Sequence, residues 1–216
     1  MSDREQLLLG IYQAMLSELG PSGWWPGETP LEVSVGAVLT QNTSWKNVAR
    51  AIHNLRERGL LDGAKLLALS PEELSELIRP AGYFRLKAGR LRNLLVFLDQ
   101  ECGFDFHDLG ERDMAELRAS LLAVRGIGPE TADSILLYAL DMPSFVVDAY
   151  TKRILNRHSL VVEDAGYDEV RDLFMDLLEP DPALFNEFHA LLVRTAATWC
   201  KKRQALCEHC PLRDYL

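Results

Sequence analysis

The sequence predicts an all-α protein of about nine or ten helices. Apolar residues recur at intervals of three and four along most of the 216-residue chain, which is the spacing of one buried helix face. Alternation at period two, the pattern of a half-buried strand, is not convincing in any segment. Glycines also divide the chain into segments of about the 11 to 12 residues typical of globular helices. With 48% hydrophobic residues, the chain can bury a substantial core.

Helix limits can be read from caps and apolar faces in chain order. Residues 8–19 present one apolar face, and Ser70 predicts the clearest helix start, because its hydroxyl can cap the first turn while Glu73 completes a capping box. Further apolar faces follow at residues 91–98, 117–124 and 132–139. Residues 21–30 are the strongest loop signal, with three prolines and two glycines in ten residues.

The charge pattern leaves two interpretations open. A net charge of −9 argues against broad electrostatic capture of DNA, because a generic binder carries a surplus of Lys and Arg. Two cationic clusters are nevertheless free of acids, residues 201–203 and the five side chains Arg79, Arg85, Lys87, Arg90 and Arg92. Each cluster is as readily a solvated helix face as a set of phosphate contacts.

No apolar run approaches the ~20 residues that a membrane span requires. Residues 1–5 are polar and charged, unlike a secretory leader. We therefore expect a protein without a membrane segment, located in the cytoplasm, where disulfides are not expected.

The tripeptide Gly126-Ile127-Gly128 is the most informative local feature. It lies between an apolar helical segment and Glu130, where a second helix is expected. Glycines permit a tight turn and leave no Cβ in the path of an anion, while the unpaired N–H groups of a helix start favour negative charge. Glycine pairs also occur in many ordinary turns, so the motif alone indicates phosphate binding only weakly. Asp148 lies eighteen residues beyond Glu130.

Residues 122–136 and 145–153 resemble the helix-hairpin-helix DNA glycosylase superfamily, in particular its endonuclease III-like group. A looser resemblance extends from about residue 24 to residue 211. In that family the hairpin holds the DNA backbone beside the damaged nucleotide, a role that the resemblance assigns to Arg125, Gly126, Ile127 and Gly128. It also makes Asp148 the catalytic carboxylate at the flipped nucleotide. On its own, Asp148 is equally suited to capping the helix that follows it.

Glu130 occupies the position at which the family divides by activity. Bifunctional members carry a Lys there, whose amine forms a Schiff base with the sugar and permits strand cleavage. Because a carboxylate cannot form an imine, the resemblance implies a monofunctional enzyme that removes the base with water. The alternative is that Glu130 is simply a favourable acid in the first turn of a helix.

The aromatic segment Trp24-Trp25-Pro26, with Trp45 further along, is similar to the bacterial 3-methyladenine DNA glycosylase branch of the superfamily. In that branch aromatic faces hold the extruded base, and the resemblance implies a base pocket formed by these residues together with Glu130. An alkylated purine is electron-poor and often cationic, so it suits a π-rich site. Large aromatics more commonly belong to cores, and that alternative stays open.

Gln41 lies where related enzymes place a residue that fills the gap left by the flipped nucleotide. A polar side chain there can hydrogen-bond the orphaned partner base. The competing interpretation is that Gln41 belongs to a helix terminus or turn.

Three cysteines, Cys200, Cys207 and Cys210, match the spacing of the first three ligands in the family's [4Fe-4S] loop. The resemblance expects a fourth cysteine at position 216, where this chain has Leu216. Three explanations are open: the protein continues, another ligand such as His209 or Asp214 completes the site, or the cluster has been lost. A zinc site of three Cys and one His is a further alternative. Nothing recommends Cys102 as a ligand.

Taken together, these features predict a two-lobed helix-hairpin-helix glycosylase fold with a C-terminal cysteine loop at about residues 200–216. One lobe is expected at residues 31–141, ending in the hairpin, and the other at residues 1–30 and 142–216. The expected activity is excision of alkylated bases such as 3-methyladenine from double-stranded DNA, by a monomer of bacterial type associated with the nucleoid. Two alternatives are an endonuclease III-like glycosylase and lyase acting on oxidised pyrimidines, and a non-catalytic hairpin DNA-binding protein.

Overall fold

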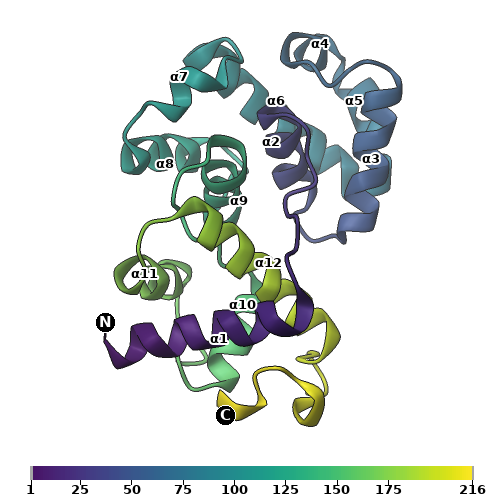
Figure 1. Cartoon of the computed structure of the whole chain (residues 1–216). Helices are drawn as coiled ribbons and strands as arrows, with labels where there is room; N and C mark the ends of the chain where they lie inside the picture. The colour runs from purple at the N-terminus through teal and green to yellow at the C-terminus, as the bar shows by residue number, and fades with distance from the viewer. Residues whose placement is uncertain (1, 216) are drawn as a thin grey trace. The chain divides into compact units, whose positions relative to one another are not determined.

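The computed structural model describes residues 2–215. Its regular elements are helices (Figure 1), and extended backbone within the described residues forms only an isolated bridge between Cys200 and Ala205. The all-α prediction is therefore confirmed. The chain divides into two compact units, one formed by Met1–Trp25 with Pro143–Leu216 and the other by Pro26–Met142.

The Pro26–Met142 unit is built around α2 (Pro30–Leu39), in which every residue after Pro30 is buried. A helix that is apolar on all sides is expected to be surrounded by others. The elements packed against it are α3 (Trp45–Glu57), α6 (Phe84–Cys102), α9 (Pro129–Ser134) and η2 (Ile135–Ala139), a π-helical continuation of α9. The shorter elements are α4 (Gly63–Ala68), α5 (Pro71–Leu77), η1 (Arg79–Ala81), α7 (Phe106–Gly110) and α8 (Met114–Ala123).

The start of α5 shows that local signals in this sequence are reliable. The Ser70 hydroxyl accepts a hydrogen bond from the Glu73 amide at 3.2 Å, and the Ser70 amide donates to Glu73 Oε2 at 2.9 Å. Pro71 occupies the first helical turn. The predicted capping box is confirmed, because its partners are only three residues apart and need no tertiary contact.

The predicted cationic cluster of α6 is largely directed into the protein. Lys87 is buried, and its Nζ donates to the carbonyls of Leu39 at 2.8 Å and Ala81 at 2.7 Å. These carbonyls end α2 and η1, where intrahelical partners run out. Burial, helped by the nearby charge of Arg90, lowers the pKa of Lys87 to about 8. Lys87 therefore acts as an internal cap and cannot contact a phosphate.

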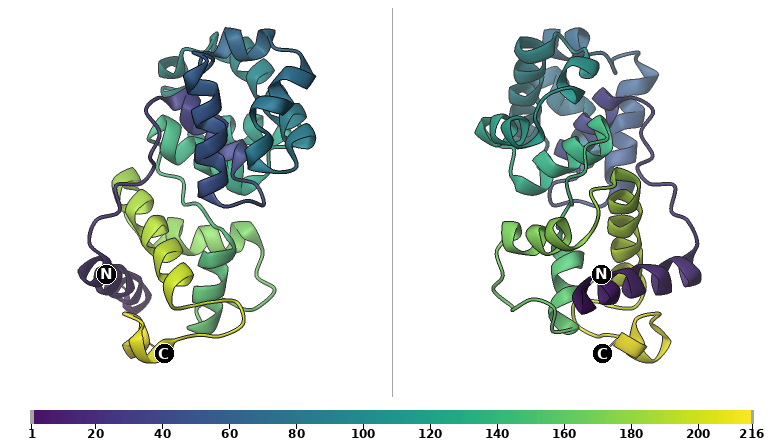
Figure 2. Two further views of the ribbon diagram at one scale, coloured as in Figure 1. Left: turned by 90° about the vertical axis from the view of Figure 1, so that its right-hand side faces the viewer. Right: turned by 60° about the vertical axis from the view of Figure 1, so that its left-hand side comes forward.

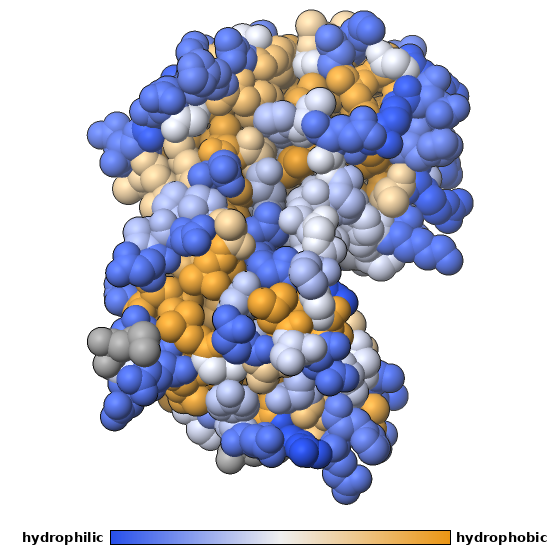
Figure 3. All heavy atoms as spheres, in the orientation of Figure 1, coloured by the Kyte–Doolittle hydropathy of each residue, from blue (hydrophilic) through white to orange (hydrophobic). Residues whose placement is uncertain are grey.

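Arg92 has a comparable role at the end of α4. Its Nη1 donates to the carbonyls of Leu67 at 3.1 Å and Leu69 at 3.0 Å. Only Arg79 and Arg85 of the predicted cluster are exposed. Figure 3 shows hydrophilic residues (blue) along the outer edge of this unit, but of the grouped cations Lys87 is buried and Arg90 and Arg92 are half-buried.

The second unit contains α1 (Asp3–Leu19), α10 (Ala149–Arg157), α11 (Tyr167–Leu177) and α12 (Pro182–Thr198), followed by the short turns η3 (Cys207–His209) and η4 (Arg213–Tyr215). Helix α12 packs against both α1 and α10 (Figure 2). The core holds an aromatic cluster in which the rings of Phe145 and Phe174 stack at 3.6 Å, with Phe188 edge-on to both. Among residues 2–215, none of the helices combines the length and apolar character that a bilayer crossing requires.

Lys87 should impose a pH dependence on stability. The folded-state pKa of about 8 lies below the ordinary value, so between about pH 8 and pH 10.4 the unfolded chain binds more protons than the folded one. The free energy of unfolding should rise with pH in this window, by up to about 1.4 kcal/mol per unit of pKa difference. Urea unfolding from pH 7 to pH 10.5 measures it, and Lys87→Met is the control that should lack this rise. Parallel curves for the two proteins would contradict the assignment.

Candidate functional site

The Gly126-Ile127-Gly128 turn joins α8 to α9 as a helical hairpin, as predicted. Helix α8 ends at Ala123, and the Ile127 amide donates to the Val124 carbonyl at 3.0 Å to close the turn. The Ile127 side chain is buried in the core of its unit. Gly128 then caps α9, whose first residue is Pro129. The buried isoleucine anchors the turn and leaves its glycines at the surface.

The two glycines of the turn have different physical requirements. Gly126 has a φ of +98°, and a Cβ there would lie 2.4 Å from Cγ of Arg90. Both the conformation and the space therefore demand glycine at Gly126. Gly128 has an ordinary φ of −100°, and a Cβ there would meet nothing within 4 Å. The backbone at Gly128 is thus open to an approaching group.

Side chains from other elements hold the hairpin carbonyls. Gln41, just after α2, donates from Nε2 to the Gly126 carbonyl at 3.1 Å and to Thr131 Oγ1 at 3.0 Å. Asn93 on α6 donates to the Arg125 carbonyl at 2.8 Å. These bonds engage the carbonyls of Arg125 and Gly126 within the unit, while the backbone at Gly128 is open. Exposed amides at a helix start are suited to binding an anion.

Gln41 is therefore part of the hairpin support in this structure. Besides its two donated bonds, its Oε1 accepts a hydrogen bond from Arg90 Nη1 at 2.5 Å. All the polar atoms of the side chain are engaged within the unit. The turn interpretation of Gln41 accounts for this arrangement, and its insertion into DNA stays a prediction.

A buried ion pair ties the two hairpin helices together. Arg118 on α8 donates from Nε and Nη2 to the two carboxylate oxygens of Asp133 on α9, at 2.9 and 3.1 Å. Asp133 is fully buried. Removing either partner would leave a buried charge uncompensated. The sequence motifs did not predict this ion pair, although Arg118 and Asp133 lie on the two helices that the sequence predicts on either side of the turn.

Asp148 caps α10 and retains one oxygen for another role. Its Oδ1 accepts from the Thr151 amide at 2.7 Å and from the Thr151 hydroxyl at 3.0 Å. Its Oδ2 lies 3.8 Å from Nε2 of His189 on α12. The preceding residues Val146 and Val147 are buried, so the carboxylate directly follows an apolar segment of the core. The capping role is confirmed, and it uses only one of the two carboxylate oxygens.

His189 is a candidate site residue that no motif in the sequence marks. Its side chain is only 9% exposed, beside an Asp148 side chain that is 15% exposed. Burial lowers the pKa of His189, although the charge of Asp148 acts in the opposite direction. A single histidine within an apolar helical stretch was the available signal, but 41 residues separate it from Asp148.

Trp24 and Trp25 belong to the same unit as Asp148. Their rings meet edge to face at a centroid distance of 5.0 Å and an angle of 61°. The Trp24 amide donates to the Ser22 hydroxyl oxygen at 3.2 Å, and Ser22 donates to Glu187 on α12 from its amide at 2.8 Å and its hydroxyl at 2.7 Å. Helix α12 therefore holds the segment that carries both indoles.

The other predicted pocket residues lie in the Pro26–Met142 unit. Trp45 is the first residue of α3 and packs against the core of that unit, as the core alternative expected. Glu130 is exposed in the first turn of α9, where an acid is favourable. Pro26 is exposed at the start of the unit. The structure thus brings Trp24, Trp25 and Asp148 into one unit, and the remaining predicted pocket residues into the other.

Tyr83 is a second residue that the sequence analysis missed. It precedes α6 with a φ of +44° and is 72% exposed. Beside it, the exposed guanidinium groups of Arg79 and Arg85 lie 4.7 and 5.6 Å from the centre of the Phe84 ring. The exposed Tyr83 ring therefore precedes a half-buried ring that two cations contact, and exposed aromatic and cationic groups are suited to a nucleic acid.

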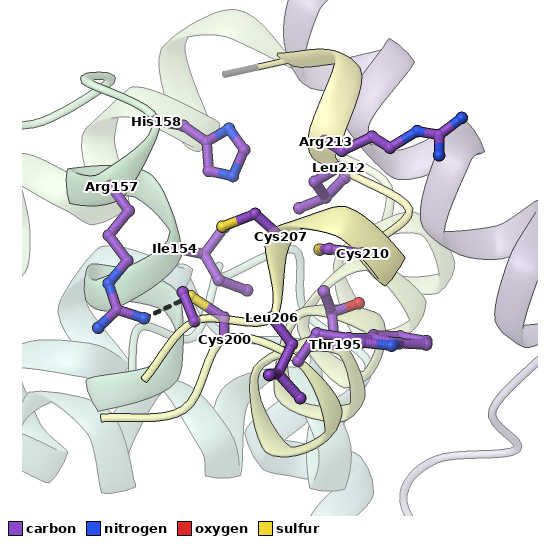
Figure 4. A pocket seen from close by; sticks show the side chains of 12 residues that line it. Ile154, Arg157, His158, Thr195, Cys200, Leu206, Cys207, Cys210, Leu212 and Arg213 are labelled. Carbon is purple, nitrogen blue, oxygen red and sulfur yellow. Dashed lines mark hydrogen bonds between the residues drawn. The ribbon is translucent and has the colours of Figure 1, made fainter. Parts of the chain in front are cut away.

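Cys200, Cys207 and Cys210 line one pocket in the unit that contains α10 and α12 (Figure 4). Arg157 on α10 donates to Cys200 Sγ at 3.1 Å and to the Lys201 carbonyl at 2.9 Å. Arg153 donates to the Cys200 carbonyl at 2.6 Å. Two arginines of one helix therefore hold the start of the cysteine loop.

The donor set of this pocket does not fit a four-thiolate cluster as folded here. The cavity measures about 20 Å³, close to the space of a single water molecule. Cys102 belongs to the other unit, His209 and Asp214 do not line the cavity, and Leu216 lies outside the described residues. Across residues 2–215, no group of three or more His, Cys, Asp or Glu side chains could hold a metal ion. Burial, with the neighbouring thiols, raises the pKa of Cys210.

Comparison with known proteins gives consistent matches. Residues 35–180 match the model of the HhH-GPD superfamily base excision DNA repair protein. A candidate DNA repair glycosylase of Methanocaldococcus jannaschii is 47% identical over 212 residues, covering 97% of this chain and 96% of that protein. Endonuclease III of Sulfolobus acidocaldarius is 27% identical over 183 residues, covering 84% of this chain and 78% of that protein.

Two solved structures are also similar. The 3-methyladenine DNA glycosylase of H. pylori, bound to 1,N6-ethenoadenine, has a TM-score of 0.77 and 28% identity over 91% of this chain and 98% of that chain. An endonuclease III–DNA covalent intermediate has a TM-score of 0.81 and 22% identity over 100% of this chain and 96% of that chain. The second likeness shows the shared fold.

Substitution of the two hairpin glycines should separate their roles. Gly126→Ala should lower the free energy of unfolding by about 1–3 kcal/mol, because alanine is strained at this φ and its Cβ meets the Arg90 stem. Gly128→Ala is the matched control and should unfold close to the wild type, since its φ is ordinary and the space is open. Chemical denaturation measures both. Equal stability of the two variants would contradict this assignment.

Proposed function

This chain belongs to the HhH-GPD superfamily of base excision DNA repair proteins and is a DNA glycosylase of that family, and we propose that it removes alkylated bases such as 3-methyladenine without cutting the strand. The observation that carries the proposal is the geometry of Asp148, which caps α10 through Oδ1 while its Oδ2 takes no part in the cap. The resemblance to the endonuclease III-like group, with a 3-methyladenine glycosylase among its structural neighbours, is confirmed.

In the proposed reaction, the bond between C1′ of the sugar and the base nitrogen breaks, and its electron pair leaves with the base. Positive charge develops on the sugar, and the ionised Asp148 carboxylate stabilises it electrostatically. A water molecule then adds to C1′ and loses a proton to solvent, which leaves an abasic site. The two hydrogen bonds from Thr151 hold Oδ1 in place before the substrate arrives.

The substrate class rests on Trp24 and Trp25. Their unit also holds Asp148, so indole faces and the carboxylate belong to one folded body. A cationic or electron-poor base is attracted to an indole face, whereas a normal base gains less. An alkylated purine is also a good leaving group, so the reaction needs little acid assistance. The similarity to the H. pylori 3-methyladenine DNA glycosylase supports the same class.

DNA contact is proposed for the hairpin and for Tyr83. The hairpin offers the open backbone at Gly128 and the exposed Arg125 to a phosphate. Tyr83 supplies an exposed ring for stacking on a base. We propose double-stranded DNA with damaged bases as the partner, and a monomer acting on nucleoid DNA in a cytoplasm of bacterial type.

The [4Fe-4S] cluster expected from Cys200, Cys207 and Cys210 stays a prediction. Such a cluster commonly accompanies endonuclease III-like relatives, but it takes four thiolates and the loop supplies three. Iron analysis of the purified protein decides between a cluster and a loop held by Arg153 and Arg157. No step of the proposed reaction runs through a metal.

Asp148→Asn should abolish base excision while preserving the fold. Asparagine is a good N-cap, so the bond from the Thr151 amide should persist, but the negative charge is lost. We expect single-turnover release of 3-methyladenine from methylated duplex DNA to fall by at least about 100-fold, with DNA affinity within a few-fold of wild type. Chromatography of the released bases measures the rate. Wild-type-like release by the variant would overturn the role of Asp148.

The absence of lyase activity is tested by borohydride trapping. Relatives named endonuclease III favour the alternative of a glycosylase with strand cleavage. Because Glu130 has no amine, we expect no covalent protein–DNA adduct after reduction in the presence of abasic DNA. An adduct would support the lyase alternative. Affinity for abasic DNA with no base release from any damaged duplex would instead favour a non-catalytic DNA-binding protein.

A further inference from the structure

We propose that His189 is a positioning residue that orients the free oxygen of Asp148 towards the reacting sugar. This inference rests on the proposed glycosylase function of Asp148. The two side chains come from different helices of one unit, the N-cap of α10 and the middle of α12, which pack against each other. His189 Nε2 lies 3.8 Å from Asp148 Oδ2.

The carboxylate geometry gives the histidine a specific task. Thr151 engages Oδ1 through its amide and hydroxyl, and both of these bonds come from the first turn of α10. Oδ2 accepts neither of these bonds, and it lies 3.8 Å from His189 Nε2. A donor within hydrogen-bond distance on that side would set the tilt of the carboxylate plane. A separation of 3.8 Å can shorten to a hydrogen bond when substrate closes the site.

The surroundings of His189 argue against an incidental core position. Its neighbours along α12, Phe188, Ala190 and Leu191, are all buried apolar residues. A buried imidazole is costly unless its polar atoms are used, and a leucine would fill the same space without that cost. The histidine nevertheless faces the carboxylate proposed to act on the sugar. Its burial therefore fits a role that an apolar side chain cannot perform.

A neutral imidazole is the appropriate partner for this carboxylate. A fixed cation such as Lys or Arg would cancel the negative charge that must stabilise the developing sugar cation. An imidazole with its proton on Nε2 donates a hydrogen bond while leaving the carboxylate charge in place. Burial, which lowers the pKa of His189, favours this neutral form.

Helix α12 links this role to the aromatic segment. Glu187, two residues before His189, holds Ser22 through two hydrogen bonds, and Ser22 in turn accepts from the Trp24 amide. One rigid helix thus positions both the proposed base-binding segment and the carboxylate. When catalytic and binding groups must be aligned in this way, a small displacement of either group lowers the reaction rate by a large factor.

The test compares His189→Leu with His189→Gln in the full-length protein. The leucine variant removes the donor, whereas glutamine places an N–H near the position of Nε2. We expect His189→Leu to slow single-turnover base release by about 10- to 100-fold, with DNA affinity within about 3-fold of wild type. His189→Gln should recover most of the rate. Thermal unfolding confirms that each variant is folded.

Each outcome of this comparison decides the inference. A folded leucine variant with the wild-type rate, or a glutamine variant as slow as leucine, would overturn it. If the leucine variant does not fold, His189→Asn replaces it, because the asparagine side chain is one methylene shorter than that of glutamine. The asparagine variant should release base more slowly than the glutamine variant. Equal rates for these two variants would overturn the inference. If the wild type itself releases no base from methylated DNA, the proposed function fails instead.

Discussion

The requirement that helix ends satisfy their backbone polar groups governs much of this structure. Many of its helices are short, so a large share of the backbone lies at a terminus where intrahelical bonds run out. Long cationic side chains reach across the fold to these carbonyls: Lys87 at the ends of α2 and η1, and Arg92 at the end of α4. The sequence pattern groups these cations as a surface stripe, but in the structure they hydrogen-bond to carbonyls at helix ends.

The same requirement creates the two features proposed to act on DNA. At the hairpin, Gln41 and Asn93 engage the carbonyls of Gly126 and Arg125, and the backbone at Gly128 is open to the ligand that we propose. At α10, Asp148 satisfies the first turn with one oxygen and keeps the other. Structural capping and proposed function therefore coincide in single residues, and neither role weakens the other.

Several expectations from the sequence survived because they depend on neighbours along the chain. The capping box of Ser70 and the cap of Asp148 each join residues three apart. The hairpin also followed from local glycines between two apolar segments. Side-chain direction was less predictable. Lys87 belongs to an apparently solvated stripe but is buried, because its register on α6 turns it towards the end of α2.

Apolar periodicity and motifs of a few residues were enough to predict the all-α class, the hairpin and the helix cap at Asp148, and the resemblance of those motifs indicated the family. Tertiary packing was needed to show which side chains meet at the candidate site. Gln41 meets Gly126 across 85 positions, and Ser22 meets Glu187 across 165. His189 reaches Asp148 only because α10 and α12 pack together. A hydrogen bond depends on distances of a few ångströms in space, and periodicity along a chain does not encode such distances between remote helices.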